Sequence, residues 1–471
     1  MLFNSIDFLV FFPTVTILYF LLPHKARWFL LLAASCFFYM AFVPKYILIL
    51  ALTIVVDYFA GIYIEKSVGK RRKMFLIISI ISTCLILFIF KYFNFFNTNI
   101  EALAHVLHWN YPIGSLKLIL PIGLSFHTFQ SMAYIIEVYR GNQKAEKHFG
   151  IYSLYVMFYP QLVAGPIERP QNLLHQFREY HKFNPSMVTS GLRLMFWGFI
   201  KKVVIADRLA LYCNEVYSNN SYHGWPVLLA IIFFAFQIYC DFSGYSDIAI
   251  GAARVMGFRL MQNFNQPYLS ASISEFWKRW HISLSTWFRD YLYISLGGNR
   301  VNITRLYFNL FITFLVSGLW HGANWTFIIW GALNGLYIIL ELSLKPFGAR
   351  LPGVFRSRPV NILITFTLIN FSWVFFRSKS VAEAVHVIGS VFPLGNIRSM
   401  AIEHFNIKDI LFALASIVAL EIVTFINGKH NLGDFLANQK KWIQWTVYYG
   451  GLALVFLFGV YNNTQFIYFQ F

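Results

Sequence analysis

The chain has 471 residues, of which 58% are hydrophobic, 20% are aromatic and only 12% are charged. Soluble globular proteins carry about 25% charged residues, so this composition excludes that class and predicts a polytopic membrane protein. The net charge of +18 does not indicate a nucleic-acid partner, because no basic helix or stacking array accompanies it. We attribute the excess to cytoplasmic loops, where it suits an anionic lipid surface or the phosphates of a coenzyme.

Apolar runs long enough for membrane helices recur along the chain. Residues 74–90, MFLIISIISTCLILFIF, contain no charge and would cross most of the hydrocarbon core as a helix. Comparable runs lie near residues 6–22, 28–43, 46–64, 118–136, 188–200, 226–239, 306–319, 325–340, 360–376, 410–427 and 443–460. The sequence therefore predicts one all-α integral-membrane domain over residues 1–471, with about 11 transmembrane helices. The shorter runs, and the stretch 151–164 that Pro160 interrupts, are expected to be re-entrant segments covered by protein.

Basic residues between these runs predict the orientation of the helices. The clusters within 66–73 and 140–147 should face the cytoplasm, whereas residues 97–116 carry no Lys or Arg, as expected outside. Lys440 and Lys441 precede the last run. Residues 462–471, an aromatic tail, should therefore emerge on the outer face.

Polar side chains at membrane depth are candidate functional groups, since each unpaired one costs several kcal/mol. Four segments carry them: 121–141 with His127; 158–170, where prolines and Gly165 forbid a continuous helix; 237–251 with Asp241 and Asp247; and 274–300 with His281. In the last segment the histidine lies among tryptophans and basic residues. An aromatic belt at the membrane interface is the simpler explanation of that composition.

His321 stands apart from these segments because it directly follows the apolar run Leu306–Trp320. A single intramembrane histidine is usually a hydrogen-bonded packing residue, but the small neighbours Gly318 and Gly322 leave room for a ligand to approach. Two intramembrane histidines would also suit a metal ion. No third ligand has suitable spacing, and the four cysteines show no metal-ligand pattern, so we predict no metal site.

Taken together, these segments resemble the membrane-bound O-acyltransferase (MBOAT) family. The motifs FHTFQSMAYIIEVYRG, FYPQLVAGPIERP, YCDFSGYSDIAIG, EFWKRWHISLSTWFRDYLYISLGGNR and SGLWHGANW occur in order, and FIYFQF closes the chain. The resemblance covers nearly the whole chain and is closest to the bacterial branch that supplies acetyl groups to exported polysaccharides such as alginate. It implies a multi-pass protein of the bacterial cytoplasmic (inner) membrane. His127 departs from the pattern, which favours an aromatic residue there, and this bears on the acyl pocket.

The resemblance implies that His321 is the catalytic histidine and His281 the second characteristic polar position. Asn324, Trp320 and Asp241 are the supporting residues. The implied fold is a ring of tilted helices around a thin central region, with funnels from both faces that meet near the catalytic histidine. No cofactor is bound; acetyl-CoA enters from the cytoplasm as acyl donor, and an acceptor hydroxyl enters from outside.

The implied chemistry is general base catalysis. Neutral His321 would take the hydroxyl proton, a contribution of about 10²–10⁴-fold to the rate. His281, Asn324 or a backbone donor would stabilise the oxyanion or orient the base, and the sequence does not divide these roles among them.

The tail NNTQFIYFQF, residues 462–471, has four large apolar side chains that each gain about 1.5–3 kcal/mol on leaving water. It therefore needs a groove. Docking on the protein's own surface is one explanation. The other, which resemblance to cell-envelope acylation systems favours, is an acyl relay in which Tyr468 passes an acetyl group to an extracytoplasmic polysaccharide acetyltransferase. An extended chain from Asn462 to Tyr468 reaches about 20 Å, which exceeds half the hydrocarbon core.

Two other functional classes are consistent with the residues. Many helices with buried Asp, Glu, His and Arg are also typical of a proton-coupled transporter, although no paired segments suggest inverted repeats. A non-catalytic scaffold that holds secreted transferases at the membrane would not need His321. Within the enzyme class, acylation of a lipid or a protein is the alternative to acetylation of a polysaccharide.

Overall fold

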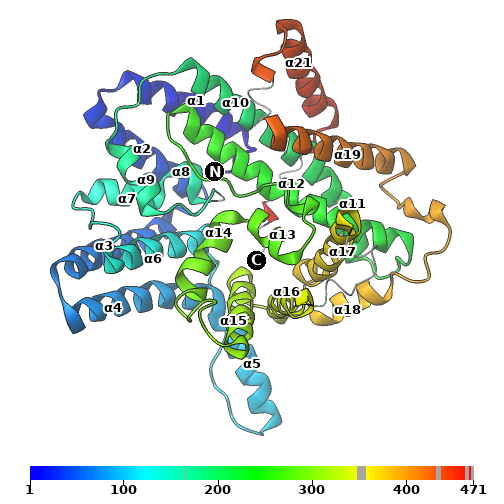
Figure 1. The fold of residues 1–471 in the computed structure, drawn as a ribbon, viewed down its shortest axis with the longest axis horizontal. Coiled ribbons are helices and arrows are strands. Elements are labelled where there is room, and N and C mark those ends of the chain that lie inside the picture. Colours follow the sequence, from blue (N-terminus) through cyan, green and yellow to red (C-terminus); the bar gives the residue numbers. More distant parts are fainter. Residues whose placement is uncertain (164, 347–356, 431–435, 462–465, 468–471) are drawn as a thin grey trace. The chain divides into compact units, whose positions relative to one another are not determined.

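The computed structural model describes the chain except for residues 164, 347–356, 431–435, 462–465 and 468–471 (Figure 1). Helices account for the regular structure of this described part, so the predicted all-α class is confirmed. Seven helical segments in it are long and apolar enough to cross a membrane, and the protein is a multi-pass membrane protein.

The sequence predicted more spans than these seven, and length explains part of the difference. Helix α1 (Ile6–Leu21) has 16 residues and is therefore about 24 Å long, which is less than the hydrocarbon core. The segment Gly69–Val106 is a continuous helical stretch of 38 residues, with a π-helical turn at Phe88–Tyr92. It runs into the region predicted as an outside loop, so residues 97–106 are helical.

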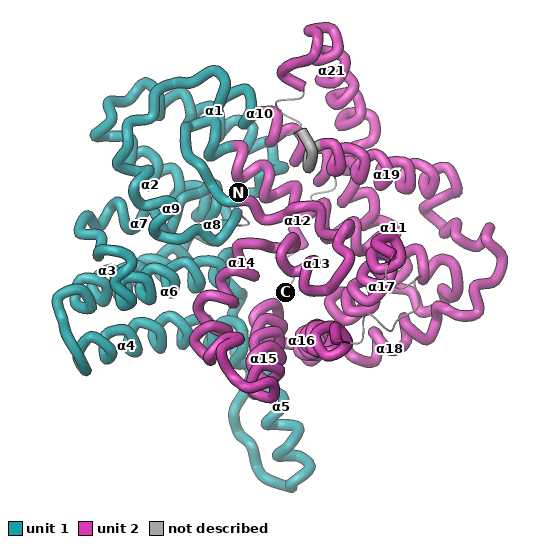
Figure 2. The backbone as a smooth tube through the Cα atoms, viewed as in Figure 1, with its two compact units in different colours: residues 1–191, 252–261 teal, residues 192–251, 262–471 magenta. Residues whose placement is uncertain are grey.

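The helices divide into two compact units (Figure 2). Unit 1 comprises residues 1–191 and 252–261. Its helices are α1, α2 (His24–Met40), α3 (Ile47–Lys66), α4 (Gly69–Leu87), α5 (Phe93–Val106), α6 (Leu124–Arg140), α7 (Phe149–Met157), α8 (Tyr159–Leu162) and α9 (Pro170–Leu173). Helices α3, α4 and α6 pack side by side within this unit (Figure 1).

Unit 2 comprises residues 192–251 and 262–471. Helices α10 (Pro185–Phe199) and α12 (Trp225–Val255) belong to both units. The others are α11 (Asp207–Ser218), α13 (Ile273–Arg279), α14 (Ile282–Trp287), α15 (Ile303–His321), α16 (Trp325–Leu344), α17 (Arg358–Arg377), α18 (Val381–Gly389), α19 (Ile407–His430) and α21 (Lys441–Phe458). Helix α12 is mostly apolar, and 89% of its apolar window is buried.

The predicted interruption near Pro160 is present. Helix α7 ends at Met157, Phe158 is non-helical, and α8 starts with Pro160 in its first turn, where a proline loses no hydrogen bond. Gly165 then passes so close to α8 that a Cβ atom would lie 2.3 Å from the Cα atom of Gln161. A side chain at position 165 would therefore push the segment away from its helix.

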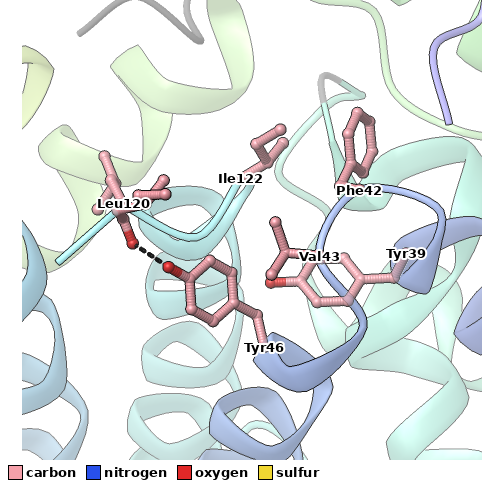
Figure 3. Close-up of a pocket in the computed structure, with 7 residues that line it drawn as sticks. Tyr39, Phe42, Val43, Tyr46, Leu120 and Ile122 are labelled. Atoms are coloured by element: carbon pink, nitrogen blue, oxygen red, sulfur yellow. Dashed lines mark hydrogen bonds between the residues drawn. The ribbon is translucent and has the colours of Figure 1, made fainter.

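A small pocket in unit 1 is built from apolar side chains (Figure 3). The residues that line it are Tyr39, Phe42, Val43, Tyr46, Ile119, Leu120 and Ile122. The hydroxyl of Tyr46 donates a hydrogen bond to the carbonyl oxygen of Ile119 over 2.7 Å. No histidine, carboxylate or thiol lines this pocket, so it has no group that could act as a base in acyl transfer.

Candidate active site

Helices α15 and α16 form a close antiparallel pair that positions His321, the last residue of α15. Two glycines make the contact possible. A Cβ atom at Gly318 would lie 2.3 Å from the carbonyl oxygen of Phe327, and one at Gly331 would lie 2.4 Å from that of Phe314. Small residues allow helix backbones to approach this closely in a membrane. The end of α15, and with it the imidazole, is therefore fixed against α16.

Gly322 follows His321 in the turn, and an aromatic ring occupies the space that a side chain at position 322 would need. A Cβ atom there would lie 2.1 Å from Cε2 of Phe327, which is buried. We expect Gly322→Ala to lower the stability of the protein by about 1–3 kcal/mol, because the ring must move in a packed core. Thermal unfolding of the purified protein measures this. Gly389→Ala is the control: no atom lies within 4 Å of its Cβ position, so its melting temperature should be unchanged or higher.

Aromatic rings surround the imidazole of His321, which is only 5% exposed. The Trp330 ring lies 5.0 Å away and nearly perpendicular to it, at 86°. The rings of Phe376 and Trp320 lie at 5.3 Å and 4.8 Å. This environment excludes water and lowers the local dielectric constant, which strengthens any charge interaction that develops beside the imidazole.

His281 occupies the turn between α13 and α14 in a left-handed backbone conformation, with φ of 43°. Such a conformation costs a residue other than glycine about 1–3 kcal/mol, and it is concentrated at functional sites. Neighbouring hydrogen bonds hold the turn: the Ile282 N–H donates to the Asn263 carbonyl, and the Ser283 hydroxyl donates to the Asn263 side chain.

The structure brings His281 and His321 together through Trp320. The indole ring centroid is 6.5 Å from the His281 ring and 4.8 Å from the His321 ring. These three residues come from two segments that are 39 positions apart in the sequence. Within the described ranges, no group of three His, Cys, Asp or Glu side chains is close enough to hold a metal ion.

Asp241 lies on α12 and forms an ion pair that the sequence analysis missed. Its Oδ1 atom is 2.7 Å from Nζ of Lys202, which also donates to Asp207 over 2.8 Å. The glycines Gly198 and Gly244 allow this, since a Cβ on either would lie within 2.8 Å of the other's carbonyl oxygen. The signal in the sequence was the KK pair that follows the run 188–200: two lysines beside apolar residues are expensive in a membrane unless they are paired.

A second ion pair lies next to the first. Nζ of Lys201 is 2.7 Å from Asp247 and 2.9 Å from the hydroxyl of Ser243, both on α12. Lys201 is 4% exposed and Lys202 is 1% exposed. Both predicted intramembrane carboxylates, Asp241 and Asp247, therefore have a cationic partner.

The described part of the aromatic tail lies against α12, as the short red segment beside that helix in Figure 1. The backbone N–H of Ile467 donates to Oδ2 of Asp241 over 2.7 Å. The Phe466 ring lies 4.5 Å from that of Tyr245 and 5.8 Å from that of Phe242. Both tail residues are buried, so this part of the tail leaves water. Tyr468, the predicted relay residue, lies outside the described residues.

Phe242 connects the tail to the histidines. Its ring packs edge-on against His281, with centroids 4.6 Å apart at 86°, and it also lies 5.8 Å from the ring of Phe466. The contacts therefore run from Phe466 through Phe242 and His281 to Trp320 and His321. The predicted site residues Asp241, His281, Trp320 and His321 belong to this one cluster.

Two other predicted residues have structural partners. Asn324 is the N-cap of α16: its oxygen accepts from the Thr326 N–H, and its amide nitrogen donates to the Lys379 carbonyl. Its polar atoms are thus engaged in holding the turn. His127 is buried in α6, with its Nε2 atom 2.5 Å from the Thr53 hydroxyl, in unit 1.

The sequence profile of the MBOAT, membrane-bound O-acyltransferase family matches residues 146–381, which include His281 and His321. This match covers half of the chain. The chain belongs to the membrane-bound O-acyltransferase family. The protein is therefore an O-acyltransferase, as the resemblance predicted.

Relatives extend the match over most of the chain. It is 39% identical over 415 residues to "Probable alginate O-acetylase AlgI" of Pseudomonas aeruginosa, covering 87% of this chain and 78% of that protein. It is 33% identical to "Peptidoglycan O-acetyltransferase" of Helicobacter pylori, covering 100% and 98%. A more distant relative, "Teichoic acid D-alanyltransferase" of Streptococcus thermophilus, is 28% identical over 56% of this chain and 69% of that protein.

Proposed function

We propose that this O-acyltransferase takes an acetyl group from cytoplasmic acetyl-CoA and moves it across the bacterial inner membrane for O-acetylation of an exported cell-envelope polysaccharide. The names of the relatives from Pseudomonas aeruginosa and Helicobacter pylori support an acetyl group and a cell-envelope polymer. The expected central region is thin, with funnels that bring donor and acceptor to His321 from opposite faces. This geometry lets one buried base serve two aqueous compartments.

In the proposed reaction, His321 is the general base and the phenol of Tyr468 is the first acceptor. The imidazole takes the phenol proton as the oxygen attacks the thioester carbonyl. The carbon–sulfur bond then breaks, and the proton passes to the leaving thiolate, which leaves acetyl-tyrosine and free coenzyme A. The buried, ring-lined environment of His321 supports this role because it excludes water, which would otherwise hydrolyse the ester.

In the second proposed step, an extracytoplasmic partner transferase takes the acetyl group from Tyr468 and transfers it to a hydroxyl of the polysaccharide. A phenol, with a pKa of about 10, leaves an ester more readily than an alkoxide does. The single observation that carries the relay is the position of the preceding residue: Ile467 is buried and bonded to Asp241, in the cluster that contains both histidines. Tyr468 is therefore one peptide away from a residue anchored in this cluster.

The mass of the C-terminal peptide after incubation with acetyl-CoA tests the proposal. We expect purified wild-type protein to gain one acetyl group on Tyr468, with release of stoichiometric coenzyme A. A transporter or a scaffold would release none. Release of coenzyme A without a tail adduct would instead favour direct transfer to a separate acceptor and return the tail to a docking role.

A further inference from the structure

We propose that Asp241 is the positioning residue that sets the register of the tail, by holding the backbone N–H of Ile467 so that position 468 is presented for acetyl transfer. This inference rests on the proposed relay through Tyr468. The proposed acyl-transfer reaction does not use the buried Lys202–Asp241 pair. In this inference the pair binds a main-chain N–H of the tail, independently of the tail's side chains.

The two carboxylate oxygens of Asp241 have different partners: one binds Lys202 and the other binds the tail. Oδ1 is 2.7 Å from Nζ of Lys202, and Oδ2 accepts the Ile467 N–H over 2.7 Å. Asp241 is 3% exposed, and Lys202 is held in turn by Asp207. Because one oxygen is fixed by a buried cation, the direction of the other is fixed as well. The position of the acceptor oxygen is thus set by residues outside the tail.

The charge on Asp241 makes this bond a strong one. An N–H bonded to a carboxylate is shorter and about twice as strong as one bonded to a neutral oxygen. Burial strengthens it further, since no water competes for the acceptor. The aromatic contacts of Phe466 with Tyr245 and Phe242 add apolar burial, but rings tolerate sliding, whereas one N–H on one oxygen does not. The hydrogen bond, rather than the ring packing, therefore sets the register of the tail along α12.

Register matters because the Cα atoms of successive residues are about 3.8 Å apart. A shift of the tail by one position would move the tyrosine by about that distance and would change the direction of its side chain. Acyl transfer requires the reacting atoms to be about 3–3.5 Å apart and aligned. In the proposed relay, a shift of one residue would therefore be enough to misplace the phenol for acetyl transfer.

Hydrogen–deuterium exchange of the full-length protein tests the anchor without reference to catalysis. In Asp241→Asn the Ile467 amide should exchange about 10- to 100-fold faster than in wild type, because a charge-assisted bond is lost. Lys202 keeps Asp207 as its partner in this variant, which favours folding. Asp247→Asn is the matched control: it breaks the neighbouring Lys201 pair on the same helix, and it should leave exchange at Ile467 unchanged. Unchanged exchange in Asp241→Asn would overturn the inference.

A second variant removes the donor and leaves the charges intact. Proline has no N–H, so Ile467→Pro should reduce acetylation of Tyr468 about 10- to 100-fold. Ile467→Val keeps the N–H and should retain the wild-type rate. The KM for acetyl-CoA should be the same in all three proteins, because the proposed relay gives the tail the role of acceptor and no part in binding the coenzyme. Full acetylation in Ile467→Pro would contradict the role of the bond.

Combining the two substitutions shows whether both act through one bond. In the doubly substituted protein the loss should be no larger than in the more affected single variant, because the same interaction cannot be lost twice. Multiplied losses would overturn the inference. If wild type shows protected exchange at Ile467 that depends on Asp241, but never acquires an acetyl group on Tyr468, then the anchor stands and the relay fails. The two proposals are thus separable.

Discussion

His321→Ala should lower the rate of acetyl transfer from acetyl-CoA by about 10²–10⁴-fold, the usual contribution of a general base. The imidazole is the one basic group at the end of α15, and the rings of Trp330 and Phe376 leave it little exposed to solvent. Loss of the side chain removes the proposed proton acceptor but leaves the surrounding aromatic rings in place. Coenzyme A release by the purified protein is the measurement.

His386→Ala is the control for this experiment, since His386 lies on α18 in the same unit and is exposed. It should release coenzyme A at the wild-type rate. Added imidazole should partly restore His321→Ala, because the substitution leaves a cavity shaped by the missing ring. If His321→Ala retains the wild-type rate, His321 is not the base. A fall in melting temperature that imidazole does not reverse would indicate a structural role.

The helices of the site follow closely from the sequence. The runs 306–319 and 325–340 correspond to α15 and α16, and the polar turn between them holds His321. A long uncharged run in a membrane forms a helix, because its backbone N–H and C=O groups must form hydrogen bonds within the segment. The sequence analysis gave Asn324 a supporting role in catalysis and did not predict its place as the N-cap of α16, although an Asn directly before a helix start is a common N-cap.

The pairs that bring these helices together could not be predicted in the same way. Asp241 meets Lys202, 39 positions earlier, because Gly198 and Gly244 allow two backbones to touch. The two adjacent lysines indicate that each needs a partner, but nothing local in either segment identifies Asp241 as that partner. The apolar run 188–200 ended the predicted span just before the lysines, although the helix continues through the π-helical turn Ile200–Ala206 into α11. The two lysines ended the apolar run in the sequence, but their ion pairs with α12 allow the helix to continue through them.

The proximity of His281 and His321 was implied by family resemblance alone. Its physical basis is the left-handed turn at His281, which directs the chain between α13 and α14, and the Trp320 ring that contacts both imidazoles. Neither spacing nor hydropathy identifies a positive φ at a histidine. The need of the tail's apolar side chains for a partner surface was predictable, but its location was not: Phe466 and Ile467 contact residues of α12, more than 200 positions earlier.

Tyr468→Phe should abolish acetylation of the polysaccharide in cells that depend on this protein. The substitution removes one hydroxyl and keeps the ring, so the apolar burial that holds the tail is preserved. The Ile467 N–H is also untouched and can still bind Asp241. In the proposed relay, no ester can form on the tail without the phenol oxygen, and the acetyl group would then have no carrier to the partner transferase. The O-acetyl content of the exported polysaccharide is the measurement.

Tyr461→Phe is a matched control, because Tyr461 is exposed and its hydroxyl only donates to the Val455 carbonyl within the end of α21. It should leave polysaccharide acetylation unchanged. Wild-type acetylation in Tyr468→Phe would exclude the relay, since a phenylalanine ring has no atom that can carry the group. The contacts of Phe466 and Ile467 on α12 would then be a docking interaction, and the polysaccharide hydroxyl, or a carrier on the partner transferase, would have to reach the His321 cluster itself.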